Sequence, residues 1–243
     1  MTDYRERIYR HYVTARGSEL APQDVAGLAA RAPYLRRLIR RHFPGDRGAV
    51  ILDLGCGHGA LLHFLREAGY QKIVGVDRSP EQVAAAKRLG IEGVREGDLF
   101  ETLRNLPAQS HDVVICFDVI EHFRRDELLP FAEEVARVLR PGGRWIVHVP
   151  NGESPFAGRM RYGDLTHELA FTRESLAQLS LSCGFSKIDC YEDGPVVHGL
   201  ASASRYVVWK MIRGMLRLYL TAEMGDTGRA AIFSQNLLSV AIK

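Results

Sequence analysis

The sequence predicts an α/β protein built on a doubly wound parallel sheet. Short apolar runs alternate with helical patterns between residues 48 and 150, as parallel strands joined by crossover helices require. The first run, Val50–Leu54, leads directly into a turn with glycine at positions 55, 57 and 59. A buried strand, a glycine-rich turn and a helix in that order predict a ligand site at the carboxyl edge of the sheet.

The other elements follow from local patterns along the chain. Ser79 and Pro80 begin a helix, because serine is a good N-cap and proline fits the first turn. Leucine and isoleucine at 28, 35, 38 and 39 recur at helical spacing, and Phe43-Pro44-Gly45 ends that helix. The expected strands cover 50–54, 72–77, 111–118, 144–150, 185–191 and 236–243. One further helix is expected to begin near residue 60. Three others are expected at 126–139, 172–183 and 205–220.

This pattern divides the chain into four parts. Residues 1–47 form an N-terminal helical cap and residues 48–193 the core of the protein. Residues 194–234 are a helical insertion, after which residues 235–243 return as the final strand of the core sheet. A long loop without regular structure is expected at 151–171, and such loops usually carry function.

The glycine turn has a spacing that separates two kinds of ligand site. Dinucleotide phosphates are bound by G-x-G-x-x-G, whereas this turn reads G-x-G-x-G and follows Asp53. A nicotinamide-dependent oxidoreductase is therefore disfavoured. The segment from Val50 to Gly59 resembles motif I of the class I S-adenosylmethionine (SAM) methyltransferases, whose loop holds the amino-acid end of SAM. The acids that follow, Asp77 after the second strand and Asp98 after the third, suit the ribose and the adenine.

The order and spacing of the elements over roughly 48–150 resemble class I SAM methyltransferases of the ubiquinone-pathway, small-molecule and glycan type. The resemblance implies a Rossmann-like seven-stranded sheet of order 3-2-1-4-5-7-6, with the last strand antiparallel. It implies SAM as cofactor and S-adenosyl-L-homocysteine as product. The residues expected to bind SAM are Asp53, Gly55, Cys56, Gly57, Asp77, Arg78, Asp98, Leu99 and Phe117.

Composition is that of a globular protein, with 46% apolar and 25% charged residues. No apolar run reaches the roughly 18 residues of a membrane span, and the first residues lack an apolar signal core. The four cysteines show no metal or disulfide spacing, which favours a reducing cytoplasmic location. Positive charge gathers in residues 1–47, either as a solvated helical face or as a rim that attracts an anionic acceptor.

Two clusters after the fourth and fifth strands are candidates for catalysis. The first, Asp118, Glu121 and His122, resembles the D/E-x-x-E-H segment of ubiquinone-pathway and small-RNA 3′-end 2′-O-methyltransferases. The resemblance makes these three residues candidate ligands of a divalent metal, although many relatives carry Glu-His without one and no metal is expected. In the alternative reading, Glu121 and His122 cap the next helix and orient the SAM loop.

The second candidate is His167, in the loop after the fifth strand, where a general base would face the substrate. His148 and His198 are weaker candidates that suit packing or loop positions. Amino-directed nucleic-acid methyltransferases carry D/N-P-P-Y/F after the fourth strand, and Cys116-Phe-Asp-Val119 stands there instead. An oxygen nucleophile is therefore favoured, and the expected catalytic residues are His167, Glu121 and His122.

The sequence thus predicts a SAM-dependent O-methyltransferase that acts on a small molecule or a sugar or glycan. A metal-dependent RNA 3′-end 2′-O-methyltransferase and a non-catalytic SAM-binding protein are the alternatives, although nucleic acid is a poor fit to the small net charge of +3. The apolar helix 205–220 bears Lys210, Arg213 and Arg217 on one face. We expect it to cap the core or to form a homodimer interface, with peripheral membrane contact as the further alternative.

Overall fold

A single seven-stranded sheet forms the centre of the molecule, in a computed structural model that describes residues 8, 21–225 and 230–243. The strand order is β3-β2-β1-β4-β5-β7-β6, as expected. β7 pairs antiparallel with β5 and β6, and the remaining neighbours are parallel. The strands are β1 Val50–Leu54, β2 Lys72–Asp77, β3 Val94–Glu96, β4 His111–Phe117, β5 Leu139–Pro150, β6 Lys187–Glu192 and β7 Asn236–Ile242.

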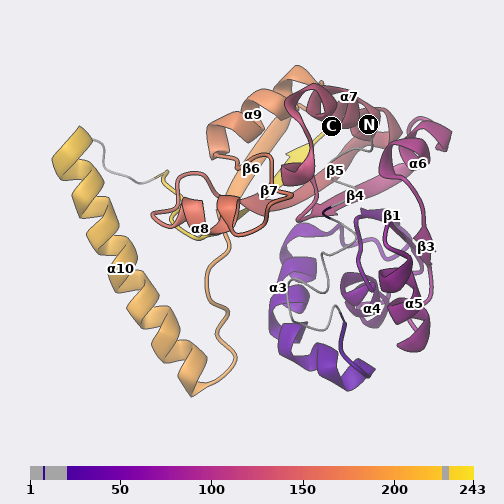
Figure 1. The fold of residues 1–243 in the computed structure, drawn as a ribbon, viewed down its shortest axis with the longest axis horizontal. Coiled ribbons are helices and arrows are strands. Elements are labelled where there is room, and N and C mark those ends of the chain that lie inside the picture. Colours follow the sequence, from indigo (N-terminus) through magenta and orange to yellow (C-terminus); the bar gives the residue numbers. More distant parts are fainter. Residues whose placement is uncertain (1–7, 9–20, 226–229) are drawn as a thin grey trace.

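Helices cover both faces of the sheet (Figure 1). On one face, α3 Ala32–His42, α4 Ala60–Glu67 and α5 Pro80–Arg88 bury their apolar side chains. On the other face lie α6 Leu99–Asn105, α7 Arg125–Val138 and α9 Arg173–Ser182. Successive residues of β1 alternate between the two layers, with Ile51 in the first and Leu52 in the second. Both faces of the sheet are therefore buried, as a doubly wound fold requires.

The N-terminal segment packs onto the first of these faces through the side chains that the sequence pattern singled out. A 3-10 helix, η1 Val25–Arg31, precedes α3, and α3 ends at Phe43 in extended backbone just before Pro44. The buried apolar side chains are Leu28, Leu35, Leu38 and Ile39. Most of the expected cap before residue 21 lies outside the described residues.

Two local expectations need correction. The segment 151–171 is not wholly irregular, because α8 Ala157–Tyr162 forms within it. The fifth strand begins at Leu139 and not at the expected position 144. Its backbone is held by the end of the chain: Gly142 donates to the Lys243 carbonyl at 2.9 Å, and Lys243 donates to the Gly143 carbonyl at 3.0 Å. This pairing joins residues about a hundred positions apart, so no local pattern predicts it.

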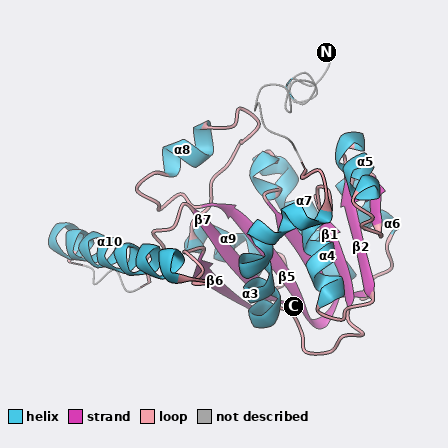
Figure 2. Ribbon diagram, turned by 90° about the horizontal axis from the view of Figure 1, so that it is seen from below, coloured by secondary structure: helices cyan, strands magenta, loops and turns pink. Residues whose placement is uncertain are grey.

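The helical insertion also differs from its expected form. α10 runs from Leu200 to Met224, longer at both ends than the expected 205–220. Figures 1 and 2 both show it leaving the body of the protein instead of covering it. Ser202 is its one buried residue. The expectation that this helix packs as a cap on the core is therefore wrong.

Candidate active site

The glycine turn after β1 has the conformation that its glycines permit. Gly55 and Gly57 have φ angles of 76° and 56°, in the left-handed region that side chains with a Cβ rarely adopt. A Cβ on Gly55 would lie 2.4 Å from the Val119 side chain. The turn is thereby held close to the segment that follows β4.

Asp77, at the end of β2, is tied to this turn. Its carboxylate accepts hydrogen bonds from the backbone N–H of Gly57 at 2.7 Å and of Ser79 at 2.9 Å. A carboxylate has about four acceptor sites, so two stay available for the hydroxyls of a ribose. Asp77 therefore shapes the loop as well as suiting the expected cofactor contact.

Asp53 is buried beneath the same turn, with 2% of its surface exposed. Burial, followed by the neighbouring charge of Asp77, raises the pKa of Asp53 to about 7. One oxygen of its carboxyl group has no hydrogen-bond partner among the described residues. An unpaired buried carboxyl group destabilises the folded protein. This oxygen would therefore suit a hydrogen bond from the ammonium group of a bound amino-acid moiety.

The other expected cofactor residues have more varied surroundings. The Cys56 side chain fills the space above Gly75, where a Cβ would lie 2.6 Å from its sulfur, and burial raises the pKa of its thiol. Asp98 is the N-cap of α6 and accepts from the Glu101 N–H at 3.0 Å. Leu99 is half-buried, Arg78 is exposed, and Phe117 stacks on His148 with ring centroids 4.7 Å apart.

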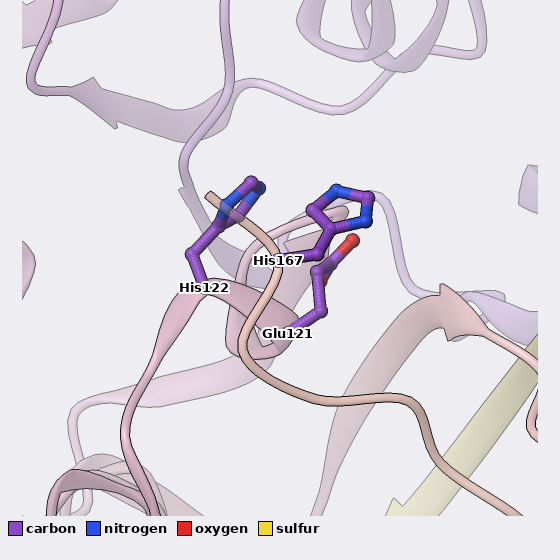
Figure 3. A group of neighbouring side chains, drawn as sticks. All are labelled: Glu121, His122 and His167. Atoms are coloured by element: carbon purple, nitrogen blue, oxygen red, sulfur yellow. The ribbon is translucent and has the colours of Figure 1, made fainter. Parts of the chain in front are cut away.

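Three expected catalytic residues come together beside this edge. Ligand atoms of Glu121, His122 and His167 all lie within 4.8 Å of one another (Figure 3). Glu121 and His122 belong to the short 3-10 helix η2 Ile120–His122, directly after β4, whereas His167 comes from the loop after α8. The Glu121 carbonyl joins the two segments by accepting the N–H groups of Glu168 at 2.8 Å and Leu169 at 3.0 Å.

Hydrogen bonds orient both imidazoles. His122 Nδ1 lies 3.2 Å from the Thr166 carbonyl, which can only accept, so Nδ1 carries a proton. His167 Nδ1 lies 2.8 Å from the Met160 carbonyl and carries a proton by the same argument. Thr166 Oγ1 donates a hydrogen bond to Asp164 at 2.6 Å. The same oxygen lies 3.0 Å from His122 Nδ1 and accepts a hydrogen bond from it.

Glu121 is the unusual member of the cluster. It is fully buried, and neither carboxyl oxygen has a hydrogen-bond partner among the described residues. Burial and the charge of Asp118 raise its pKa well above the usual value, while burial and the neighbouring His167 lower the pKa of His122 to about 4. Two imidazoles beside an unpaired carboxyl group fit a divalent cation, which would compensate the charge of the ionised carboxylate.

Asp118 lies outside this cluster. Its backbone has a φ of 54°, and its carboxylate meets His148 Nδ1 at 2.7 Å. The other nitrogen of His148, Nε2, lies 3.1 Å from the carboxylate of Asp193. Burial by itself would lower the pKa of His148, but the two carboxylates raise it to about 10. His148 is therefore a buried imidazolium held between two carboxylates.

The sequence patterns did not single out this role for His148. Phe117 and His148 are partners in the parallel pairing of β4 with β5, so a histidine at this register lies beside whatever follows β4. The pairing of β4 with β5 was therefore the signal that could have placed His148 beside Asp118. The third residue of this ion-pair group, Asp193, follows β6, which is two strands away from β5 in the sheet. Asp193 and His148 are 45 residues apart in the chain.

The alternative role for Glu121 and His122, as caps of the next helix, is wrong. The N-cap of α7 is Arg124, whose backbone N–H donates to the Glu127 carboxylate at 2.7 Å. The helix start is thus satisfied within its own first turn. His198 lies in an exposed segment before α10, where its backbone N–H donates to Ser202 Oγ at 2.8 Å.

A cavity of about 860 Å³ lies elsewhere, between η1, α3, α4, the segment before α10 and Tyr206 of α10. None of its lining residues belongs to the glycine turn or to the Glu121 cluster. Arg36 at its wall pairs with Glu67 at 3.0 Å, and Arg37 donates to the Gly194 carbonyl at 3.2 Å. Part of the positive charge of the N-terminal segment is therefore used in contacts within the protein.

Comparison with known proteins agrees with this geometry. Residues 52–147 match the model of a methyltransferase domain. A probable S-adenosylmethionine-dependent methyltransferase of Mycolicibacterium smegmatis is 31% identical over 171 residues, 69% of this chain and 65% of that protein. The ubiquinone biosynthesis O-methyltransferase of Idiomarina loihiensis is 33% identical over 116 residues, 46% of each chain. The chain thus spans less than two thirds of these curated relatives.

A solved structure shows the same fold. A SAM-dependent methyltransferase from Archaeoglobus fulgidus superposes with a TM-score of 0.66, covering 89% of this chain and 94% of that one at 21% identity. By its sheet order, its glycine turn and its family match, the chain belongs to the class I SAM-dependent methyltransferases.

Proposed function

We propose that this protein transfers the methyl group of SAM to a hydroxyl oxygen of a small molecule or glycan. The observation that carries the proposal is the cluster of Glu121, His122 and His167, with its ligand atoms within 4.8 Å of one another. Substrates of open α/β sheets bind at the carboxyl ends of the strands, where this cluster lies. A hydroxyl must lose its proton when it is methylated, and these three groups are suited to that task.

The proposal includes a divalent cation at the cluster. The sequence alone favours a metal-free site, but an unpartnered buried carboxyl group beside two imidazoles, with all three ligand atoms within 4.8 Å of one another, supports a bound cation. Glu121, His122 and His167 would hold it, and carboxylate and imidazole ligands suit several divalent metals. When bound, such a cation lowers the pKa of a hydroxyl near it.

The protein's own residues orient and shield the reacting groups. Asp164 holds Thr166, and Thr166 in turn holds the ring of His122. The Met160 carbonyl holds His167, whose side chain is 10% exposed. Asp53, Asp77 and the glycine turn would fix the cofactor, so that the sulfonium methyl and the acceptor oxygen meet in near-attack geometry. Such positioning accounts for much of the rate of a displacement reaction.

Methylation of an RNA 3′-terminal ribose is the second candidate, because the same cluster would suit its 2′-hydroxyl. The small net charge of +3 weakens this candidate, since phosphate backbones are bound by larger basic surfaces.

The four cysteines have no disulfide partners, which supports the cytoplasmic location expected from the sequence.

The test is product analysis by mass spectrometry. The protein is incubated with isotopically labelled SAM and separate pools of phenols, sugars and short RNAs, with and without added Mg²⁺, Mn²⁺ or Zn²⁺. A methyl ether in the phenol or sugar pool supports the proposal. Label found on nitrogen overturns it, label on an RNA 3′ end supports the second candidate, and SAM binding without any product indicates a non-catalytic SAM-binding protein.

A further inference from the structure

α10 is a long helix with little support from the rest of the protein. Its 25 residues extend for about 37 Å at 1.5 Å per residue. It is attached mainly through one face, where Arg213 pairs with Glu192 at 2.7 Å and Trp209 approaches Gly194. Figure 2 shows the helix extending beyond the edge of the sheet that carries β6.

The opposite face of α10 is apolar and open to solvent. At 100° per residue, the exposed apolar side chains of this face, which are named below, occupy an arc of about 140° around the helix axis. A surface helix normally turns such an arc toward the core, and α10 turns it away. The exposed side chains of this arc and their exposed fractions are Leu200 93%, Val207 58%, Val208 55%, Met211 66%, Ile212 42%, Met215 68%, Leu218 71% and Tyr219 59%. Tyr206 and Met224 are also exposed but lie outside the arc.

Positive charge borders this arc. The helix contains four basic residues, Arg205, Lys210, Arg213 and Arg217, and one acidic residue, Glu223. Arg205 lies beside one border of the arc, and Lys210 and Arg217 lie toward the other. Only Arg213 is paired with an acid outside the helix, among the ion pairs of the described residues. The apolar arc is thus flanked by cations on both sides.

We propose that α10 lies flat on a membrane surface that contains anionic lipid. An apolar arc bordered by basic side chains is the pattern of helices that bind at the lipid interface, where the cations meet phosphate groups. A second copy would bring together two helices of the same positive charge, and an arc of about 140° is wider than a coiled-coil seam. None of the helices that the structure describes is long and apolar enough to cross a membrane.

Flotation with lipid vesicles tests the proposal on the full chain. Vesicles of phosphatidylcholine alone are compared with vesicles that contain about one third phosphatidylglycerol, at low and high salt. We expect at least about tenfold tighter binding to the anionic vesicles at low salt, with the preference lost at high salt. The double variant Lys210→Gln/Arg217→Gln should lose the same preference, since it removes two of the bordering cations.

A second pair of variants isolates the apolar arc. Met211→Gln/Leu218→Gln should lower vesicle binding at least about tenfold, because two side chains no longer enter the acyl region. Leu129→Gln/Leu181→Gln is the matched control, since both positions are exposed apolar residues on other helices, at 48% and 56%. The control should bind vesicles like the wild type, and SAM affinity and the circular-dichroism melt should show that both variants fold.

The remaining outcomes overturn the proposal. Analytical ultracentrifugation, run in parallel without lipid, detects a dimer. A concentration-dependent dimer that Met211→Gln/Leu218→Gln returns to monomer, with no binding to vesicles, would assign the arc to a second copy. A monomer that binds neither kind of vesicle, or equal loss of binding in the Leu129→Gln/Leu181→Gln control, would also refute a membrane role for α10.

Discussion

His148 Nδ1 lies 2.7 Å from a carboxylate oxygen of Asp118, at the ends of the neighbouring parallel strands β5 and β4. The carboxylate of Asp193 is 3.1 Å from the other ring nitrogen, so the imidazolium has an anion at each end. Asp118 lies between β4 and η2, and its φ of 54° is unusual for a residue with a side chain. The ion pair helps to hold this conformation and thereby the start of the segment that carries Glu121 and His122.

The free energy of unfolding should depend on the ionisation of His148. Its folded-state pKa of about 10 is above the unfolded value of about 6.5, so its stabilising contribution is complete below pH 6.5 and is lost as the pH rises to 10. Urea unfolding at pH 6, 8 and 10 should show stability falling by up to about 1.4 kcal/mol per pH unit. His148→Asn should be less stable at pH 6 and flatter across this range. An equally steep fall in the variant would assign the pH dependence to other groups.

Replacement of Asp77 by alanine should weaken SAM binding. The carboxylate would no longer hold Gly57 and Ser79, nor accept the ribose hydroxyls, and each hydrogen bond to a charged acceptor contributes about 1.5–3 kcal/mol. Isothermal calorimetry should therefore show at least about a tenfold rise in Kd. Glu81→Ala, an exposed acid in the first turn of α5, is the control and should bind SAM normally. Unchanged affinity in Asp77→Ala would remove the ribose assignment.

Metal binding should depend on Glu121. The wild type is expected to take up about one equivalent of Mn²⁺ or Zn²⁺ in calorimetry, with SAM present or absent, because the buried carboxyl group gains a cationic partner. Glu121→Gln keeps the shape and should lower metal affinity at least about tenfold. Chelator should abolish turnover of the wild type and added metal should restore it. Full turnover in excess chelator would leave the cluster to act by proton transfer alone.

His167→Ala should lose turnover but keep the cofactor. His167 lies beside Glu121 and His122 and not in the glycine turn. If it is the proposed general base, kcat should fall by about 10²–10⁴ while SAM affinity stays within about twofold. Leu165→Ala is the control, since Leu165 is in the same loop with 78% of its surface exposed. If His167→Ala is as active as Leu165→Ala, the loop shapes the pocket without taking part in the reaction.

Thr166→Val tests the support of His122. The substitution removes the hydroxyl that lies between Asp164 and the His122 ring, at 2.6 Å and 3.0 Å, but leaves the hydrogen bond from the ring to the Thr166 carbonyl. We expect metal affinity to fall about 10-fold or more, as for other residues that orient a metal-binding histidine. Thr166→Ser keeps the hydroxyl and should restore the wild-type affinity. A loss in Thr166→Ser with none in Thr166→Val would point to packing of the methyl group instead.

The sequence by itself determined where the main strands and helices lie along the chain. It also determined the glycine turn and Asp77 at the carboxyl edge of the sheet. Alternating apolar runs and helix starts are local patterns, so β1, β2 and the N-cap at Ser79 were predicted closely. The glycine turn and Asp77 are fixed by consecutive residues around two strands that pair directly. The order of the seven strands came from resemblance to a family, because pairing of distant strands leaves little trace in one sequence.

Only the tertiary structure decided which side chains meet. Glu121 and His167 are 46 positions apart and come together because the Glu121 carbonyl binds the loop at Glu168 and Leu169. The partnership of His148 with Asp193 requires two non-neighbouring strands to end at the same edge. The direction of α10 was equally hidden, because an apolar periodicity predicts an amphipathic helix without saying what covers its apolar face.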